Sequence, residues 1–147
     1  MNLSNDLESA LANGTPFAVL RATIARFQCD AGTIHLLAEG VLKLAAHANI
    51  PPPVVEIVQT VTIGKGIAGL AAERLQPISL CNLQTDTTGQ ARPTAKTTGM
   101  EGSIAVPMLA GTTLRGVLGI AKAHAHDWTE AEKTELLAIA ARFAERV

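Results

Sequence analysis

A glycine-rich motif is the first candidate for chemistry in this sequence. Gly64 to Gly69 reads GxGxxG, and Asp86 follows at nearly the spacing at which an acidic residue grips a ribose. In dinucleotide-binding proteins the motif follows a buried parallel strand, whereas the apolar residues from Val54 to Val61 have helical spacing. We therefore expect the glycines to allow a tight turn and close helix packing, with no cofactor bound.

The two cysteines, Cys29 and Cys81, are a second candidate, and they show no CxxC spacing. A reactive thiol needs a nearby cation or a helix N-terminus to lower its pKa, whereas a free cysteine more often packs as a small apolar residue. We expect burial of both, more strongly for Cys29. A reactive thiol at Cys81 is the alternative.

A third candidate is the short stretch that holds His124, His126 and Asp127. Two close histidines and a carboxylate can ligate zinc, but a further ligand such as His35 would have to approach from a distant strand. We expect a solvated loop and no metal site. The sequence shows no Ser-His-Asp arrangement and no nucleophile elbow, so no catalytic residue is assigned.

The chain before residue 30 predicts two short helices. Leucines at every fourth residue from Leu3 to Leu11 indicate the first, which ends at Gly14. Thr15 can cap the second helix, with Pro16 at its first position, where a missing N–H costs nothing. The apolar face expected for this second helix consists of Phe17, Leu20, Ile24 and Phe27.

Further elements follow from hydrophobic period and turn residues. Helices are expected at 54–61 and 67–75, and Thr129 with Glu132 forms a capping box before a last helix. The apolar stripe of that helix is Leu136, Ala140, Phe143, Ala144 and Val147. Gln84 to Lys96 is expected to be a long loop. The expected strands are Thr33–Leu37, Val41–Ala46 after a turn at Glu39-Gly40, Ile78–Leu80, Ser103–Leu109 and Leu114–Lys122.

These elements predict an α+β fold with layers in the order α/β/α around a central antiparallel sheet. Its last strand pair is apolar on both faces, so both faces must be covered. The terminal helices can cover one face, and the helices and loop between residues 51 and 98 can cover the other. A ligand cavity is expected on that second side.

Composition limits the function classes. A chain of 147 residues fits one domain, here 1–147. A net charge of −1 and 3% aromatic residues argue against nucleic-acid partners, which need many cations or stacking platforms. No apolar run reaches the roughly 18 residues of a membrane span, and no signal peptide opens the chain. We therefore expect a cytoplasmic protein that does not enter a membrane.

Five segments, taken in order, resemble the GAF domain family. They are Val61–Glu73 for its turn and helix, Pro77–Leu83 for the strand that leads into the pocket, Thr98–Met108 for the central strand, Leu114–Ile120 for the next strand, and Trp128–Glu132 for the entry to the last helix. The resemblance implies a GAF/PAS-like antiparallel sheet with a helix bundle behind it. It also implies a pocket in front, under the segment from Cys81 to Ser103.

The resemblance implies ligand sensing, because GAF domains bind cyclic nucleotides, bilins, haem, or small acids and oxyanions. The NKFDE pattern of phosphodiesterase GAF domains is not present, and neither cysteine lies in a bilin-attachment context. The expected ligand is a small anionic or amphoteric molecule, near Lys65 and Lys96. A mobile loop that Arg92 and Lys96 merely solvate is the alternative. The expected ligand-binding residues are Cys81, Asn82, Arg92, Thr98, Glu101 and Ser103.

One GAF branch, the free methionine-(R)-sulfoxide reductases, is enzymatic and uses cysteines. Its helix signature carries a cysteine where this chain has Ala68, and its reactive cysteine precedes the central strand, where this chain has Lys96 to Thr98. We therefore expect no enzyme activity. The leading interpretation is a sensor that signals through its terminal helices, as a homodimer or to a partner signalling protein. The alternatives are such a reductase and a structural dimerisation module with a closed pocket.

Overall fold

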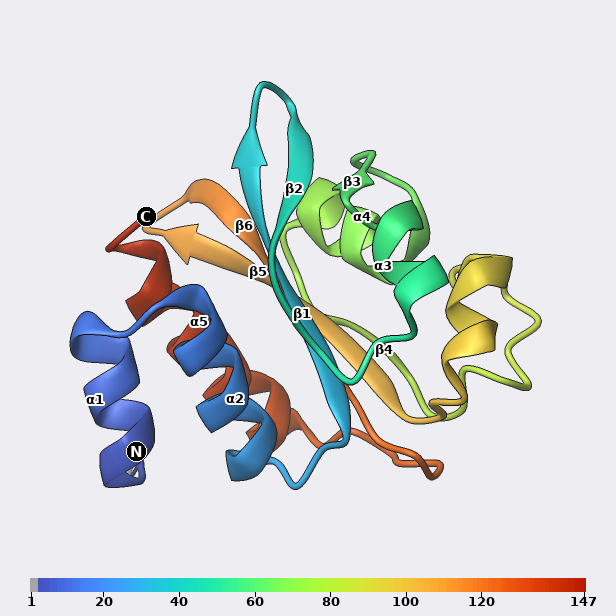
Figure 1. Cartoon of the computed structure of the whole chain (residues 1–147), viewed down its shortest axis with the longest axis horizontal. Coiled ribbons are helices and arrows are strands. Elements are labelled where there is room, and N and C mark those ends of the chain that lie inside the picture. The colour runs from blue at the N-terminus through green and yellow to red at the C-terminus, as the bar shows by residue number, and fades with distance from the viewer. Residues whose placement is uncertain (1–2) are drawn as a thin grey trace.

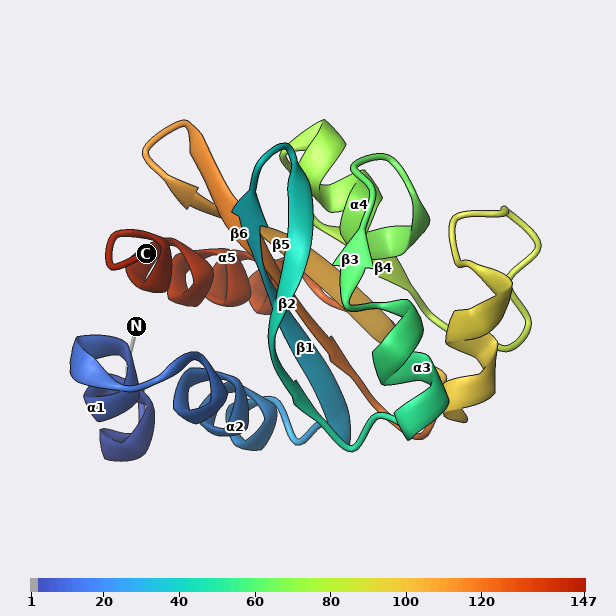
Figure 2. The same ribbon diagram turned by 45° about the horizontal axis from the view of Figure 1, so that its top comes forward.

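A six-stranded antiparallel sheet forms the centre of the molecule, with helices on both faces (Figures 1 and 2). The computed structural model describes residues 3–147, and the strand order is β3-β2-β1-β6-β5-β4. The strands are β1 (Ala31–Ala38), β2 (Val41–Ala48), β3 (Thr60–Val61), β4 (Ile78–Leu80), β5 (Ser103–Ala110) and β6 (Thr113–Ala121). The predicted α+β architecture, with both sheet faces covered, is confirmed.

Three helices cover the face of the sheet that we call the back: α1 (Asn5–Asn13), α2 (Pro16–Arg26) and α5 (Glu130–Ala144). Large side chains from the strands, including Ile34, Leu118 and Ile120, join Leu20 and Leu136 in the main core. Burial of this apolar surface, at about 25 cal/mol per Å², is the largest favourable contribution to folding.

The predicted apolar face of α2 is partly wrong. Leu20 is fully buried and Phe27 is 7% exposed, but Phe17 is 50% exposed. The helix instead turns Val19 and Thr23 inward. The Thr23 hydroxyl is satisfied there because it donates to the Val19 carbonyl oxygen at 2.7 Å, so burying it costs little.

Local signals place the element boundaries. The Thr15 hydroxyl accepts a hydrogen bond from the Ala18 N–H, and Thr129 and Glu132 form the full capping box at the start of α5. Glu39 and Gly40 have φ values of 55° and 80°, the left-handed pair that a two-residue hairpin between β1 and β2 requires. These predictions are confirmed.

The opposite face, the front, is covered by α3 (Pro52–Ile57), α4 (Gly66–Arg74) and the 3₁₀ helix η1 (Pro93–Thr98). The helix predicted to reach Val61 ends at Ile57, so that prediction is wrong beyond this residue. Thr60 and Val61 pair with β2 as strand β3 instead. The predicted loop from Gln84 to Lys96 is irregular only as far as Arg92, because η1 begins at Pro93.

The glycine motif forms a turn between β3 and α4. Gly64 has φ of +94°, and a Cβ at Gly69 would lie 2.5 Å from the Thr62 carbonyl oxygen. The strand before the motif is a two-residue antiparallel edge strand, whereas a dinucleotide-binding unit needs a parallel one. The expectation of a framework turn holds, although a strand rather than a helix directly precedes it.

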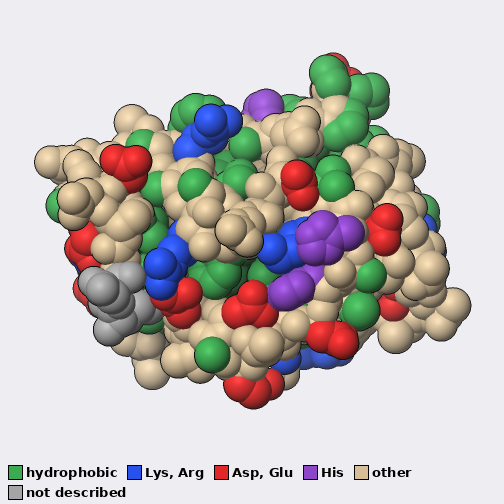
Figure 3. Space-filling model, turned by 90° about the horizontal axis from the view of Figure 1, so that it is seen from below, with side chains coloured by type: hydrophobic (Ala, Val, Ile, Leu, Met, Phe, Trp, Pro, Cys, Tyr) green, Lys and Arg blue, Asp and Glu red, His purple; other side chains and the backbone are tan. Residues whose placement is uncertain are grey.

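The terminal helices contribute their apolar stripes to the core of the domain itself, but the prediction that Val147 belongs to the last stripe is wrong, because α5 ends at Ala144 and Val147 is exposed. Leu7 and Leu11 of α1 and Phe143 of α5 are at most 2% exposed. Arg142 of α5 forms an exposed ion pair with Glu8 of α1 at 2.9 Å. Acidic and basic side chains are interspersed on the face seen in Figure 3. In residues 3–147, no helix has both the length and the apolar character that crossing a membrane takes.

Candidate functional site

A cavity of about 170 Å³ lies between the front of the sheet and α3, α4 and η1. It exists because the central strands carry small side chains toward the front at one end of the sheet, whereas their back-facing neighbours are large. The front-facing positions are Ala31, Thr33, Ser103, Ala105, Gly119 and Ala121. The wall opposite the sheet is formed by apolar residues of the covering segments, among them Val54, Ile57, Ile67, Leu83, Ala91 and Ala95.

His35 is the most buried ionisable group in the cavity lining, with 2% exposure. Its Nε2 lies 2.9 Å from the Val58 carbonyl oxygen, so this nitrogen carries the proton and donates. The contact ties β1 to the end of α3. Its Nδ1 is also buried, and no atom of residues 3–147 forms a hydrogen bond with it. Burial lowers the pKa of His35 below its ordinary value and favours the neutral ring.

Two cations lie at the rim of the cavity. Lys65 precedes the first residue of α4, and Arg92 precedes the first residue of η1. Both line the cavity and both are exposed. The stem of Arg92 passes over α4 so closely that a Cβ at Gly66 would lie 3.1 Å from its Cγ. Among the hydrogen bonds and ion pairs of residues 3–147, neither cation has a partner.

The structure divides the six residues predicted to bind a ligand into two groups of three. Arg92, Thr98 and Ser103 line the cavity. Cys81, Asn82 and Glu101 lie outside its lining, and the Asn82 amide donates to the Glu101 carboxylate at 3.1 Å. A direct role for these last three in ligand binding stays a prediction.

The loop that leads into η1 is held by its own polar side chains. The Gln84 amide donates to the carbonyl oxygens of Lys96 and Met100, at 2.9 and 2.7 Å. Lys96 donates to the Asp86 carbonyl oxygen at 3.1 Å, so it secures the loop. The Thr88 hydroxyl donates to the Asp86 carboxylate and lowers its pKa. Asp86 therefore has a structural partner inside the loop rather than the ribose of a dinucleotide.

The thiols are poorly suited to nucleophilic chemistry. Cys29 is half-buried, and desolvation raises its pKa to about 12. Cys81 is exposed, so the expectation that it is buried is wrong, and a hydrogen bond with Asp127 raises its pKa as well. A thiol with a raised pKa holds little thiolate at neutral pH, and thiolate is the nucleophilic form.

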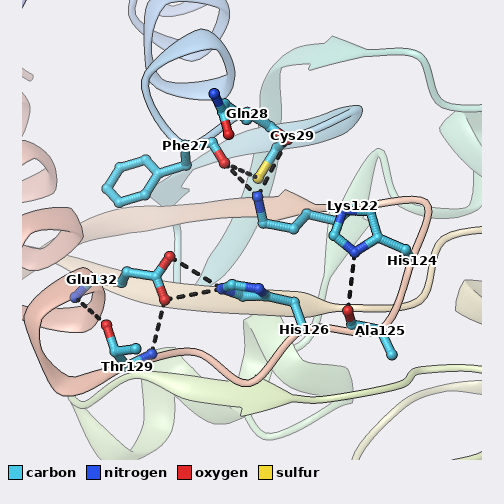
Figure 4. Close-up of polar contacts among 9 residues, drawn as sticks. All are labelled: Phe27, Gln28, Cys29, Lys122, His124, Ala125, His126, Thr129 and Glu132. Carbon is cyan, nitrogen blue, oxygen red and sulfur yellow. Dashed lines mark hydrogen bonds and ion pairs between the residues drawn. The ribbon is translucent and has the colours of Figure 1, made fainter.

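The histidines near the end of β6 have separate partners (Figure 4). The His126 ring points to the Glu132 carboxylate at 2.9 Å, whereas His124 Nδ1 lies 3.0 Å from the Ala125 carbonyl oxygen. Lys122, only 6% exposed, donates to the carbonyl oxygens at the end of α2. Residues 3–147 contain no cluster of three or more His, Cys, Asp or Glu placed to hold a metal ion.

Sequence reasoning missed His35 and Gly119 as cavity residues. The signal for His35 is an ionisable side chain among the apolar residues Ile34, Leu36 and Leu37 of the expected strand. Gly119 interrupts the apolar residues of β6, and a Cβ there would meet only Thr33 Oγ1 at 3.5 Å and the Ile104 carbonyl oxygen at 3.7 Å. Its missing side chain therefore leaves room in the cavity floor.

The comparison with protein families decides the classification of the chain. The GAF domain model matches residues 18–145. The chain belongs to the GAF family. This membership agrees with the resemblance of the five sequence segments and with the antiparallel sheet covered on both faces. No match was found among the curated proteins.

Several solved structures share this GAF fold. The GAF domain of a phosphoenolpyruvate-protein phosphotransferase from Coxiella burnetii is 23% identical, with a TM-score of 0.73 and coverage of 97% of this chain and 82% of that one. A free methionine-R-sulfoxide reductase from Neisseria meningitidis is 17% identical, with a TM-score of 0.77 and coverage of 95% and 83%. A domain of a sensor histidine kinase protein from Sinorhizobium meliloti is 18% identical, with a TM-score of 0.70 and coverage of 97% and 92%. At these identities the similarity concerns the fold.

Proposed function

We propose that this GAF domain is a sensor module that holds a small anionic or amphoteric molecule in its front cavity. The observation that carries the proposal is the cavity itself, which combines apolar walls with hydroxyl side chains and with the rim cations Lys65 and Arg92. Binding sites commonly combine apolar walls with a few convergent polar groups. The cavity also favours ligand binding over the alternative of a closed, purely structural pocket.

Ligand binding in the cavity can affect the terminal helices through the strands of the sheet. The cavity floor consists of the front positions of β1, β5 and β6, and the back positions of the same strands pack on α2 and α5. His35 joins β1 to the end of α3 through Val58. A ligand that draws α3 and η1 toward the sheet would stiffen both sides of it. The output would pass through the terminal helices, in a homodimer or to a partner protein.

Isothermal titration against small carboxylic acids tests the proposal. The panel contains formate, propionate, lactate, benzoate and the three hydroxybenzoates. The matched variant is Gly119→Val, because a side chain at this position enters the cavity floor and its Cβ would have no contact shorter than 3.5 Å. Thr113→Val, at an exposed position on the same strand, is the control. At least one acid should bind the wild type and the control, and Gly119→Val should weaken that binding at least about 10-fold, since filling a pocket removes the ligand's space. No heat and no thermal shift from any acid would contradict the proposal.

We further propose that the domain is not a methionine sulfoxide reductase. Reduction of a sulfoxide needs an attacking thiol and a resolving thiol. Ala68 and Thr98 line the cavity at or near the positions where the resemblance places reductase cysteines. Both thiols of the chain have raised pKa values and lie outside the cavity lining. Turnover of free methionine sulfoxide that is lost in Cys81→Ser would refute this.

A further inference from the structure

The charged side chains that line the front cavity are of one sign. Lys65 and Arg92 belong to the lining, whereas no Asp or Glu of residues 3–147 does. The other polar side chains of the lining are hydroxyls of Ser and Thr and the imidazole of His35, whose lowered pKa favours the neutral ring. The lining can therefore balance a negative charge on a ligand, but it offers no group that balances a positive charge.

Two acidic residues of the covering segments, Glu73 and Asp86, lie outside the lining. Glu73 lies against the glycine turn, since a Cβ at Gly64 would be 2.7 Å from its Oε2. The Asp86 carboxylate accepts from the Thr88 hydroxyl at 2.6 Å and from the Ala91 N–H at 3.4 Å. An ammonium group inside the cavity would therefore have no carboxylate of the lining as its partner, and an unpaired charge is costly to bury.

The rest of the lining is mostly apolar and encloses the space of a small ring. Its volume of about 170 Å³ is close to the ~150 Å³ of an apolar cavity that accepts benzene. Small side chains such as Ala105 and Ala121 form the floor, and aliphatic ones such as Val54 and Ile67 form the opposite wall. Each methylene group that leaves water for such surroundings strengthens binding about 4-fold. An anion with no apolar body, such as formate, therefore gains little from these walls.

We propose that the domain selects small monocarboxylic acids with an apolar body and rejects α-amino acids with the same body. The selection rests on the proposed ligand binding and narrows the ligand from anionic or amphoteric to anionic. In an α-amino acid the ammonium group is on the carbon next to the carboxylate. A carboxylate that approaches Lys65 or Arg92 therefore brings the ammonium group close to the same cation, where like charges repel each other.

Ligand pairs that differ only in the α-ammonium group test the selection by isothermal titration near neutral pH. The pairs are butyrate with 2-aminobutyrate, 3-methylbutanoate with valine, and 4-methylpentanoate with leucine. The acid of each pair should bind at least about 10-fold more tightly than the amino acid, because the amino acid brings an unpaired ammonium group next to a cation. Butyrate should also bind at least about 10-fold more tightly than acetate, since it adds two methylene groups.

Thr94 offers a matched pair of variants that changes the charge of the lining. It belongs to the lining and is half-buried, and among the hydrogen bonds of residues 3–147 only its carbonyl oxygen takes part, as the acceptor from Thr97. Thr94→Asp adds a carboxylate, and Thr94→Asn adds a neutral side chain of the same shape. Thr94→Asp should reduce the preference for the acid at least about 10-fold, whereas Thr94→Asn should keep it.

The outcomes separate this inference from the proposed function. If acids bind but the amino acids bind as tightly, or if only the amino acids bind, the inference is wrong while the proposed function stands. The same conclusion follows if the preference is equal in Thr94→Asp and Thr94→Asn. If neither the acids nor the amino acids bind, both proposals fail.

Discussion

Lys122 provides a sharp test of the packing that positions the sheet behind the cavity. Its ammonium donates to the Phe27 carbonyl oxygen at 2.5 Å and to the Gln28 carbonyl oxygen at 3.3 Å, where α2 ends (Figure 4). The same group lies 5.7 Å from the centre of the Trp128 ring. A cation in this position satisfies carbonyl groups that the helix leaves free and complements the helix dipole. Lys122→Met keeps most of the stem and removes these contacts.

The expected cost follows from those contacts. A hydrogen bond that involves a charged group contributes about 1.5–3 kcal/mol, and the shorter contact should carry most of it. The cation–π contact adds roughly 0.5–1 kcal/mol. Part of this loss is offset, because the variant no longer has to remove a charged group from water on folding. We expect Lys122→Met to lower the free energy of unfolding by about 3 kcal/mol, because the Gln28 carbonyl oxygen loses its side-chain partner and the Phe27 carbonyl oxygen keeps only the 3.7 Å contact with Cys29 Sγ.

Urea denaturation followed by circular dichroism measures this loss. With an m value of about 1.5–2 kcal/mol/M, the midpoint should fall by roughly 1.5–2 M. Lys43→Met is the control, because Lys43 is exposed and its single contact, with Thr60 Oγ1, is 3.3 Å long. Its effect should stay within about 0.5 kcal/mol. A loss below about 1 kcal/mol for Lys122→Met, or equal losses in both variants, would refute the reasoning.

Three further predictions concern stability. Thr129→Ala removes the hydroxyl that caps α5 and should cost about 1 kcal/mol in thermal or urea unfolding; an unchanged midpoint would contradict the capping. Gly69→Ala places a Cβ 2.5 Å from the Thr62 carbonyl oxygen and should cost about 1–3 kcal/mol, whereas Gly119→Ala, with its nearest contact at 3.5 Å, should stay within about 1 kcal/mol of the wild type. Burial lowers the pKa of His35 from 6.5, so the unfolded chain binds a proton that the folded protein excludes. The contribution of neutral, buried His35 to stability is full above about pH 6.5 and is lost as the pH falls below that value. Between pH 6.5 and 5, the free energy of unfolding should therefore decline less steeply in His35→Gln than in the wild type; identical slopes would contradict this.

Much of the fold was predictable because its signals are local. Thr15 with Pro16, the Glu39-Gly40 turn and the Thr129 capping box each act within four residues of chain. The apolar residues on both faces of β5 and β6 are also a local signal, and they predicted that each face of the sheet is covered. Family membership followed from five such local segments in one order.

The errors concern pairings between distant residues. The spacing from Val54 to Val61 is helical, but the Gln59 carbonyl oxygen accepts from Leu44 and the next two residues pair with β2, which ends the helix early. Burial of Cys81 was predicted from residue type, whereas its exposure follows from the place where β4 ends at the sheet edge.

The candidate site was predictable in position and only partly in composition. The sequence predicted a cavity on the front face, under the segment before β5, and Arg92, Thr98 and Ser103 line the cavity there. The role of His35 was not predictable, since it depends on the Val58 carbonyl oxygen, 23 residues away, and on an irregularity in the pairing of β1 with β2 between Ile34 and His35. The empty space at Gly119 likewise depends on three strands at once.

The most direct measurement is an amide ¹H–¹⁵N titration of the wild-type domain with the tightest acid of the panel. The front-cavity proposal predicts that the largest shifts cluster at Thr33, Ala105 and Gly119 on the floor and at Ala68 and Ala95 in the cover. The same titration of Gly119→Val should leave the signals of Thr33, Ala105, Ala68 and Ala95 in place. Shifts that gather on α2 and α5 behind the sheet, or shifts of equal size in Gly119→Val, would contradict the assignment of the cavity as the binding site.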